Sequence, residues 1–137
     1  MDYHAHGLVT SEYLYTADGK KLQGSVYDYD LKTLAAGHNT ADAVVFPALK
    51  TLVQSSFDAA GGDSLSVTVS NTYDEYGNLQ GYKETAAAYS LEADISYHKI
   101  AGRYIVGIPS HITVSSGGRT YRERSTKVDG NGEITEI

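Results

Sequence analysis

Residues 65–73 alternate between two kinds of side chain. The apolar positions are Leu65, Val67, Val69 and Tyr73, with one asparagine as the interruption, and serine or threonine fills every position between them. A period of two residues places the apolar side chains on one face of an extended strand and the hydroxyl side chains on the other. This stretch therefore predicts a β-strand in a sheet with one polar face.

The same alternation returns over residues 91–97 and 104–114, and it predicts two more strands. Threonine and tyrosine are frequent in these segments, and both suit a pleated, half-buried surface. Weaker alternation predicts further strands at residues 8–15, 22–29, 80–89 and 119–128. The chain is thus expected to consist largely of strands.

Residues 41–53 are ambiguous. Phe46, Leu49 and Val53 would share one face of a helix, but Pro47 would interrupt that helix. We expect an irregular strand here, with a short helix as the alternative.

Turn signals rich in glycine separate the predicted strands. They are Asp18-Gly19, residues 60–63, Gly77-Asn78, Gly117-Gly118 and residues 129–132. Short turns of this kind join neighbouring antiparallel strands. The sequence therefore predicts an all-β fold, with antiparallel hairpins in a meander, over a single domain of residues 1–137. A chain of 137 residues is long enough to bury one hydrophobic core, and we expect one.

One turn form recurs along the chain. The segments YDEYGNL (73–79) and VDGNGEI (128–134) share an apolar residue, Asp, two variable positions, Gly, a polar residue and an aliphatic residue. Residues 57–62 give a third copy and residues 15–20 a degraded fourth. The Asp carboxylate can accept hydrogen bonds from turn amides, and the Gly supplies a positive φ. The expected tip residues are Tyr73, Asp74, Gly77, Asn78, Phe57, Asp58, Gly61, Asp129 and Gly132.

These copies resemble the YD repeat of the RHS family, whose form is roughly Tyr-Asp-x-x-Gly-Asn/Arg-Leu. Residues 107–134, GIPSHITVSSGGRTYRERSTKVDGNGEI, are similar to the family's Gly-Leu-Pro strand, short turn, Arg- and Thr-rich strand and repeat tip. Residues 44–62 followed by 66–78 look like the hairpin spacing of the shell subunits of insecticidal toxin complexes. The resemblance is strongest over residues 44–134.

The resemblance implies an architecture. RHS proteins coil a ribbon of β-hairpins into a hollow shell that encloses a toxin domain or forms part of a surface adhesion protein. For this chain it implies a non-enzymatic segment of such a shell or cell-surface scaffold, secreted or at the cell surface as part of a longer protein. The implied partners are neighbouring repeats of that polypeptide or a second copy in a homo-oligomer. The start, MDYHAHGLVT, lacks the parts of a signal peptide, so export would use another signal.

The composition argues against several other functions. There is no cysteine for a disulfide or a thiolate metal site, and the net charge of -6 comes without a basic run that would bind nucleic acid. No apolar run is long enough to insert in a membrane. His4 and His6 are spaced to share one strand face, but a frayed terminus is the favoured interpretation. The sequence contains no Gly-x-Ser-x-Gly, Gly-Lys-Ser/Thr or His-Glu-x-x-His motif, and we expect no enzyme activity, cofactor or metal.

Tyrosine suggests the alternative function. The chain has twelve tyrosines and no tryptophan. A tyrosine ring can stack on a sugar, which would make the chain a carbohydrate-binding module, whereas tyrosines in a sheet more often form cross-strand ladders. Three or more rings exposed on one concave face would favour sugar binding. The candidate stacking residues are Tyr13, Tyr15, Tyr27, Tyr29, Tyr82 and Tyr89.

Overall fold

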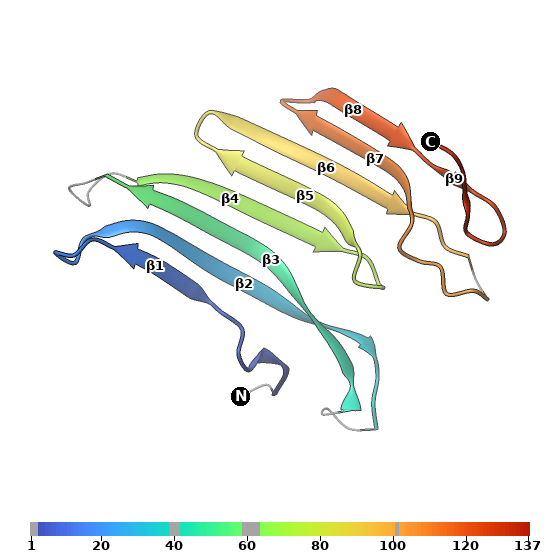
Figure 1. The fold of residues 1–137 in the computed structure, drawn as a ribbon, viewed down its shortest axis with the longest axis horizontal. Helices are drawn as coiled ribbons and strands as arrows, with labels where there is room; N and C mark the ends of the chain where they lie inside the picture. The colour runs from blue at the N-terminus through green and yellow to red at the C-terminus, as the bar shows by residue number, and fades with distance from the viewer. Residues whose placement is uncertain (1–2, 39–41, 59–63, 101) are drawn as a thin grey trace.

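The computed structural model describes residues 3–38, 42–58, 64–100 and 102–137. Eight strands form one antiparallel sheet in chain order, and two short strands form a second hairpin beyond the end of β8 (Figure 1). The expected all-β antiparallel meander is confirmed. The strands of the large sheet are β1 (Ser11–Tyr15), β2 (Lys21–Ala35), β3 (Val44–Phe57), β4 (Ser64–Tyr73), β5 (Leu79–Ala86), β6 (Tyr89–Tyr97), β7 (Pro109–Ser116) and β8 (Arg119–Ser125), and the small hairpin pairs β9 (Lys127–Val128) with β10 (Ile134–Glu136).

The ambiguous stretch at residues 41–53 contains most of β3 and no described α-helix. The strand is irregular as expected, because its pairing with β2 skips Lys50, which forms a β-bulge. Pro47 pairs with Leu31 on one side, while the pairing of β3 with β4 begins only at Thr51. A proline tolerates this position because it lies at a free edge of the strand, where no ladder partner needs its missing N–H. The helical alternative is wrong.

The predicted strand over residues 104–114 is wrong in its first half. Only residues from Pro109 onward form a strand, whereas the preceding segment is a loop in which Ile105 forms an isolated bridge with Ile100. Gly102 turns the chain at φ +88 and Tyr104 follows at φ +52, so the backbone cannot stay extended. The alternation of apolar residues there does not report a strand.

The strand register gives the sheet two different faces. Directly opposite residues point to the same side of a sheet. Leu52 pairs with Val69, and Ala93 lies between Tyr82 and Val114. We call this side the apolar face; its apolar members are Tyr27, Leu52, Val67, Val69, Tyr82, Leu91, Ala93, Ile95, Ile112 and Val114, and Gln54, Asn71 and Glu84 lie among them. The opposite side, the hydroxyl face, carries Thr51, Ser55, Ser66, Thr68, Ser70 and Thr85, together with the paired Val26 and Val53.

The sheet remains in one layer, so the expected hydrophobic core does not form among the residues that the structure describes. Among the described residues, Ala48 is the only hydrophobic one that is buried, with 3% of its surface exposed. No α-helix or large second sheet lies against either face in the described parts of the chain. The length of the chain allowed a core, but a core needs a second layer of structure, and this chain places its strands side by side instead.

Candidate functional site

The turn between β4 and β5 shows why its sequence has the YDEYGN form. The carboxylate Oδ1 of Asp74 accepts hydrogen bonds from the backbone N–H groups of Tyr76 and Asn78, both at 2.9 Å. The N–H of Gly77 donates to the Asp74 carbonyl at 3.2 Å, and Gly77 lies in the left-handed region at φ +86. Asp74 and Gly77 thus have the two roles that the sequence predicts for them.

The turn between β9 and β10 has the same geometry. Oδ1 of Asp129 accepts hydrogen bonds from the N–H groups of Asn131 at 2.8 Å and Glu133 at 2.9 Å. The N–H of Gly132 donates to the Asp129 carbonyl at 3.0 Å, and Gly132 has φ +85. Two segments far apart in the chain therefore form one kind of turn from one sequence form.

The degraded copy between β1 and β2 forms this turn with a hydroxyl in place of the carboxylate. Oγ1 of Thr16 accepts a hydrogen bond from the N–H of Lys20 at 2.9 Å, and the N–H of Gly19 donates to the Thr16 carbonyl at 3.0 Å. Gly19 has φ +85. Of the remaining copy, Phe57 ends β3 and Asp58 follows it, while Gly61 lies outside the described residues.

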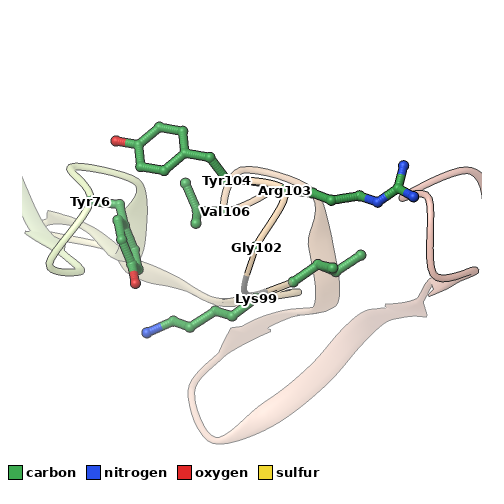
Figure 2. Close-up of a pocket in the computed structure, with 7 residues that line it drawn as sticks. Tyr76, Lys99, Gly102, Arg103, Tyr104 and Val106 are labelled. Atoms are coloured by element: carbon green, nitrogen blue, oxygen red, sulfur yellow. The ribbon is translucent and has the colours of Figure 1, made fainter.

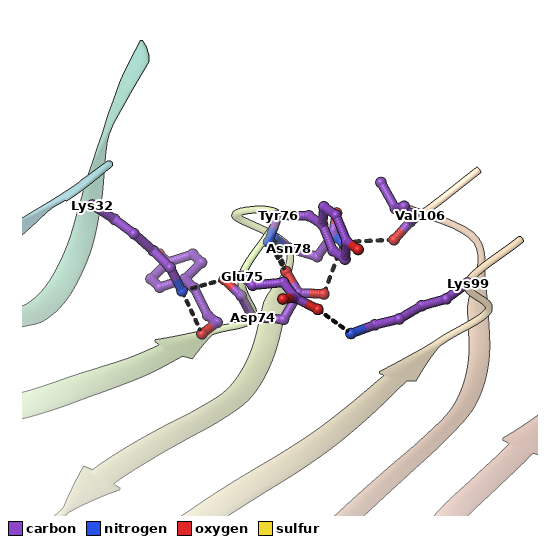
Figure 3. Close-up of polar contacts among 8 residues, drawn as sticks. Lys32, Asp74, Glu75, Tyr76, Asn78, Lys99 and Val106 are labelled. Atoms are coloured by element: carbon purple, nitrogen blue, oxygen red, sulfur yellow. Dashed lines mark hydrogen bonds and ion pairs between the residues drawn. The ribbon is translucent and has the colours of Figure 1, made fainter. Parts of the chain in front are cut away.

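The Asp74 turn also joins the β4–β5 hairpin to the connection between β6 and β7 (Figure 3). Nδ2 of Asn78 donates to Oδ2 of Asp74 at 3.1 Å and to the carbonyl of Val106 at 2.7 Å. Nζ of Lys99 forms an ion pair with Oε1 of Glu75 at 2.6 Å. The contacts with Val106 and with Lys99 therefore join the turn to the loop after β6.

On the other side of this turn, β2 and β3 make the contacts. Nζ of Lys32 donates to the carbonyls of Tyr73 and Asp74. Phe46 packs edge-on against the Tyr73 ring, with the ring centroids 5.3 Å apart. The turn is therefore held from both flanks, by Lys32 and Phe46 of the long β2–β3 hairpin on one side and by Lys99 and Val106 on the other.

The two turn aspartates are hydrogen-bond acceptors that remain ionised at neutral pH. Partial burial would raise the pKa of Asp74, but the hydrogen bonds from Asn78 and Tyr76 outweigh it and leave the pKa below the usual value of 3.8. Hydrogen bonds from the backbone of Glu133 above all, and from Asn131, lower the pKa of Asp129. Both carboxylates are thus committed to closing turns.

A cavity of about 570 Å³ opens beside the Asp74 turn (Figure 2). The rings of Tyr76 and Tyr104 stand at 88° with centroids 6.5 Å apart, and Nζ of Lys99 lies 5.1 Å from the Tyr76 centroid. Tyr104 is 83% exposed, and it is the one non-glycine residue in the described chain with a positive φ. The sequence reasoning missed this site because it placed Tyr104 in a strand; the glycine two residues before it was the available signal. The lining residues are Tyr76, Lys99, Ile100, Gly102, Arg103, Tyr104 and Val106.

The six predicted stacking tyrosines form three pairs on two faces. Tyr27 and Tyr29 stack at 6.4 Å on β2, and Tyr13 and Tyr15 lie 6.3 Å apart on β1. Tyr13 faces the hydroxyl side, since it pairs with Gly24, and Tyr27 faces the apolar side. The exposed members are Tyr13, Tyr15 and Tyr89, which do not share a face.

The third pair is joined by a carboxylate. The hydroxyls of Tyr82 and Tyr89 both donate to Glu84, each at 2.5 Å. The hydrogen bond to Glu84 stabilises the protonated phenol and raises the pKa of Tyr82 to about 12. Glu84 therefore fixes the hydroxyl groups of both tyrosines on the sheet.

Other kinds of site find little support in the described residues. There is no group of three His, Asp or Glu side chains in these ranges that would hold a metal ion. Nor does any helix in them have the length and hydropathy to cross a bilayer.

Comparisons with known protein families, with characterised proteins and with solved structures give no match to this chain.

Proposed function

We propose that the chain is a non-enzymatic structural module, a segment of a hairpin-built shell or cell-surface scaffold of the RHS type, associated with toxin encapsulation or adhesion. The observation that carries this proposal is the single-layer sheet, in which Ala48 is the only buried hydrophobic residue of the described chain. A sheet with an apolar face and no second layer is suited to be completed by other structure.

The exposed surface shows how incomplete the module is. A compact protein of 14.8 kDa exposes roughly 7,000 Å². This chain exposes 9221 Å², which is about 2,200 Å² more. A stable interface needs about 800 Å² from each partner, so the excess is large enough to be covered by neighbouring hairpins or by a partner chain.

The turns support the repeat part of the proposal. Three hairpins close with one hydrogen-bond pattern and with glycines at φ +85, +86 and +85. A recurring supersecondary unit whose apolar face is buried only by neighbouring units is the mark of a repeat array. Together with the YDEYGNL segment, this favours a piece of a longer hairpin ribbon.

The isolated chain tests the proposal. We expect it to bind a hydrophobic dye such as ANS under native conditions, and to associate as its concentration rises in light scattering after size exclusion. A monomer at every concentration that binds no dye would refute the proposal. The parent polypeptide can be tested separately, because a longer reading frame that ends in a toxin domain should surround this segment.

A second proposal, carbohydrate binding, rests on the Tyr76–Tyr104 cavity. Tyr104 presents an exposed ring from a backbone with positive φ. Strained residues cluster at ligand and active sites, and a tyrosine ring can pack on an apolar ligand face. Tyrosine fluorescence titrated with a panel of oligosaccharides should then report saturable binding that Tyr104→Ala abolishes and Tyr89→Ala preserves. Titrations with no saturable change would remove this proposal.

A further inference from the structure

We infer that a second copy of this chain covers the apolar face, so that two sheets pack face to face about a two-fold axis that runs roughly along the strands. The inference rests on the proposed function, because it names the partner that completes the module. Two sheets in such a sandwich lie about 10 Å apart and interdigitate their inner side chains.

The centre of the face has the composition of an interface core. From β3 to β7 it presents Leu52, Val69, Ala93 and Ile95, with the uncharged amides of Gln54 and Asn71 beside them. The one acidic side chain there, Glu84, accepts hydrogen bonds from two tyrosine hydroxyls. Interface cores are depleted of charge and enriched in aromatic residues. The centre of this face fits that description.

The two ends of the same face carry opposite charge. At the β1 end, Glu12 pairs with Ser25 and accepts a hydrogen bond from the Tyr27 hydroxyl at 2.6 Å, which places its carboxylate on the apolar face. At the β8 end, Arg122 and Arg124 pair with Val114 and Ile112 and therefore point to this face too. Figure 1 shows β1 and β8 at opposite sides of the sheet. The face thus runs from an acidic edge to a basic edge.

Both arginines are available to a partner. Neither guanidinium makes an ion pair or a side-chain hydrogen bond with any part of the chain that the structure describes. A two-fold axis along the strands brings the β8 edge of one copy over the β1 edge of the other, at both ends of the interface. Glu12 of each copy then faces the arginine pair of the other, and arginine binds carboxylates well.

The register sets the angle between the two sheets. Directly paired residues form a row that crosses the sheet from strand to strand. The row that starts at Glu12 reaches β4 at Val67, and the row that starts at Arg122 reaches β4 at Asn71, four residues farther along. At about 3.3 Å per residue, this offset is roughly 13 Å across a sheet about 34 Å wide. A crossing angle of about 30°, which is usual for aligned sheets, takes up most of the offset. A face with this charge order is complementary to itself, and this identifies the partner as a second copy.

A pair of neighbouring substitutions tests the surface. Val67→Asp places a charge on the apolar face, and Thr68→Asp places the same charge on the hydroxyl face one residue away. We expect the wild type and Thr68→Asp to be dimeric in sedimentation equilibrium and Val67→Asp to dissociate at least tenfold more readily. Circular dichroism verifies that both variants fold. Equal dimerisation of the two variants would overturn the inference.

A charge exchange tests the arrangement of the two copies without touching the apolar centre. Glu12→Lys alone and the double variant Arg122→Glu/Arg124→Glu alone should each dimerise at least tenfold more weakly than wild type, because like charges then face each other at both ends. Mixed together, they should form a heterodimer visible by native mass spectrometry. If the mixture stays monomeric, or if both variants dimerise as wild type does, the proposed arrangement is wrong.

The outcomes also separate this inference from the proposed function. Association that survives both Val67→Asp and the charge exchange would come from strand edges; it would overturn the face-to-face dimer and leave the structural module standing. A monomer that binds no hydrophobic dye would overturn both.

Discussion

Replacing the turn glycine by alanine in each of the three hairpin turns separates backbone strain from steric overlap. Gly19, Gly77 and Gly132 have φ of 85, 86 and 85 degrees, so the backbone strain on an alanine is the same in all three. Their surroundings differ. A Cβ at Gly19 meets nothing within 4 Å, and a Cβ at Gly77 lies 3.3 Å from Cδ1 of Phe46. A Cβ at Gly132 overlaps Cδ1 of Ile105.

These contacts set the expected order of the penalties. A left-handed backbone costs an alanine about 1–2 kcal/mol. The lower entropy of the unfolded alanine chain returns about 0.4–1 kcal/mol, so Gly19→Ala should lower the free energy of unfolding by about 1 kcal/mol. Gly77→Ala should cost slightly more, and Gly77→Val should cost about 1 kcal/mol or more. Gly132→Ala should cost about 0.5–1.5 kcal/mol more than Gly19→Ala, because the Ile105 side chain must leave its preferred rotamer.

Urea unfolding followed by circular dichroism, with all proteins at one concentration, measures these differences. Ile105→Val removes the overlapping Cδ1 and supplies the matched control. In the double variant Gly132→Ala/Ile105→Val, the alanine should cost only what it costs at Gly19. Equal penalties at all three turns would show that an alanine at position 132 does not overlap Ile105. A Gly19→Ala variant with the free energy of unfolding of the wild type would refute the argument from backbone strain.

Four further predictions follow from the polar contacts and from the absence of a metal cluster in the described ranges. The lowered pKa of Asp74 means that the Asp74 carboxylate contributes its full stabilisation above about pH 3.8 and loses it as the pH falls below that value. Urea midpoints measured down to about pH 3 should therefore fall less steeply with pH in Asp74→Asn than in the wild type. Ultraviolet titration should show Tyr82 ionising near pH 12, and Glu84→Gln should lower this pKa. The stabilisation from the Tyr82–Glu84 hydrogen bond should be complete below pH 10.0 and lost as the pH rises toward 12. Asn78→Ala should cost about 1–2 kcal/mol in urea unfolding because a loop carbonyl loses its donor, while Glu133→Ala, at the equivalent exposed position, should be neutral. A chelator should leave the unfolding curve unchanged, and a shift would reveal a metal requirement.

The local parts of this fold could be predicted from the sequence because they depend on neighbouring residues. Alternation over residues 65–73 reports a strand directly, and the Asp-x-x-Gly spacing reports a turn whose donors and acceptor lie within five residues. The same reasoning failed at Tyr104, where five residues of alternation coincide with a loop that turns at Gly102. Alternation over so short a stretch does not distinguish a strand from a loop.

Features that depend on distant residues could not be predicted. The bulge at Lys50 exists only relative to β2, and the face on which Tyr13 lies depends on its pairing with Gly24. The cavity beside Tyr76 needs the loop that carries Tyr104, twenty-eight residues farther along the chain. The described residues also lack a hydrophobic core, and this could not be predicted either. No local pattern states whether an apolar face will meet a second layer of structure.

The strand order has a consequence for how the chain folds. Each strand of the large sheet hydrogen-bonds only to the strands that directly precede and follow it in the chain. Every pairing can therefore form by closing one short loop, without waiting for a distant segment, and folding with such local contacts is fast. The sheet can grow strand by strand while the polypeptide is still being synthesised. Insertion or removal of a hairpin would change its width without rerouting any connection.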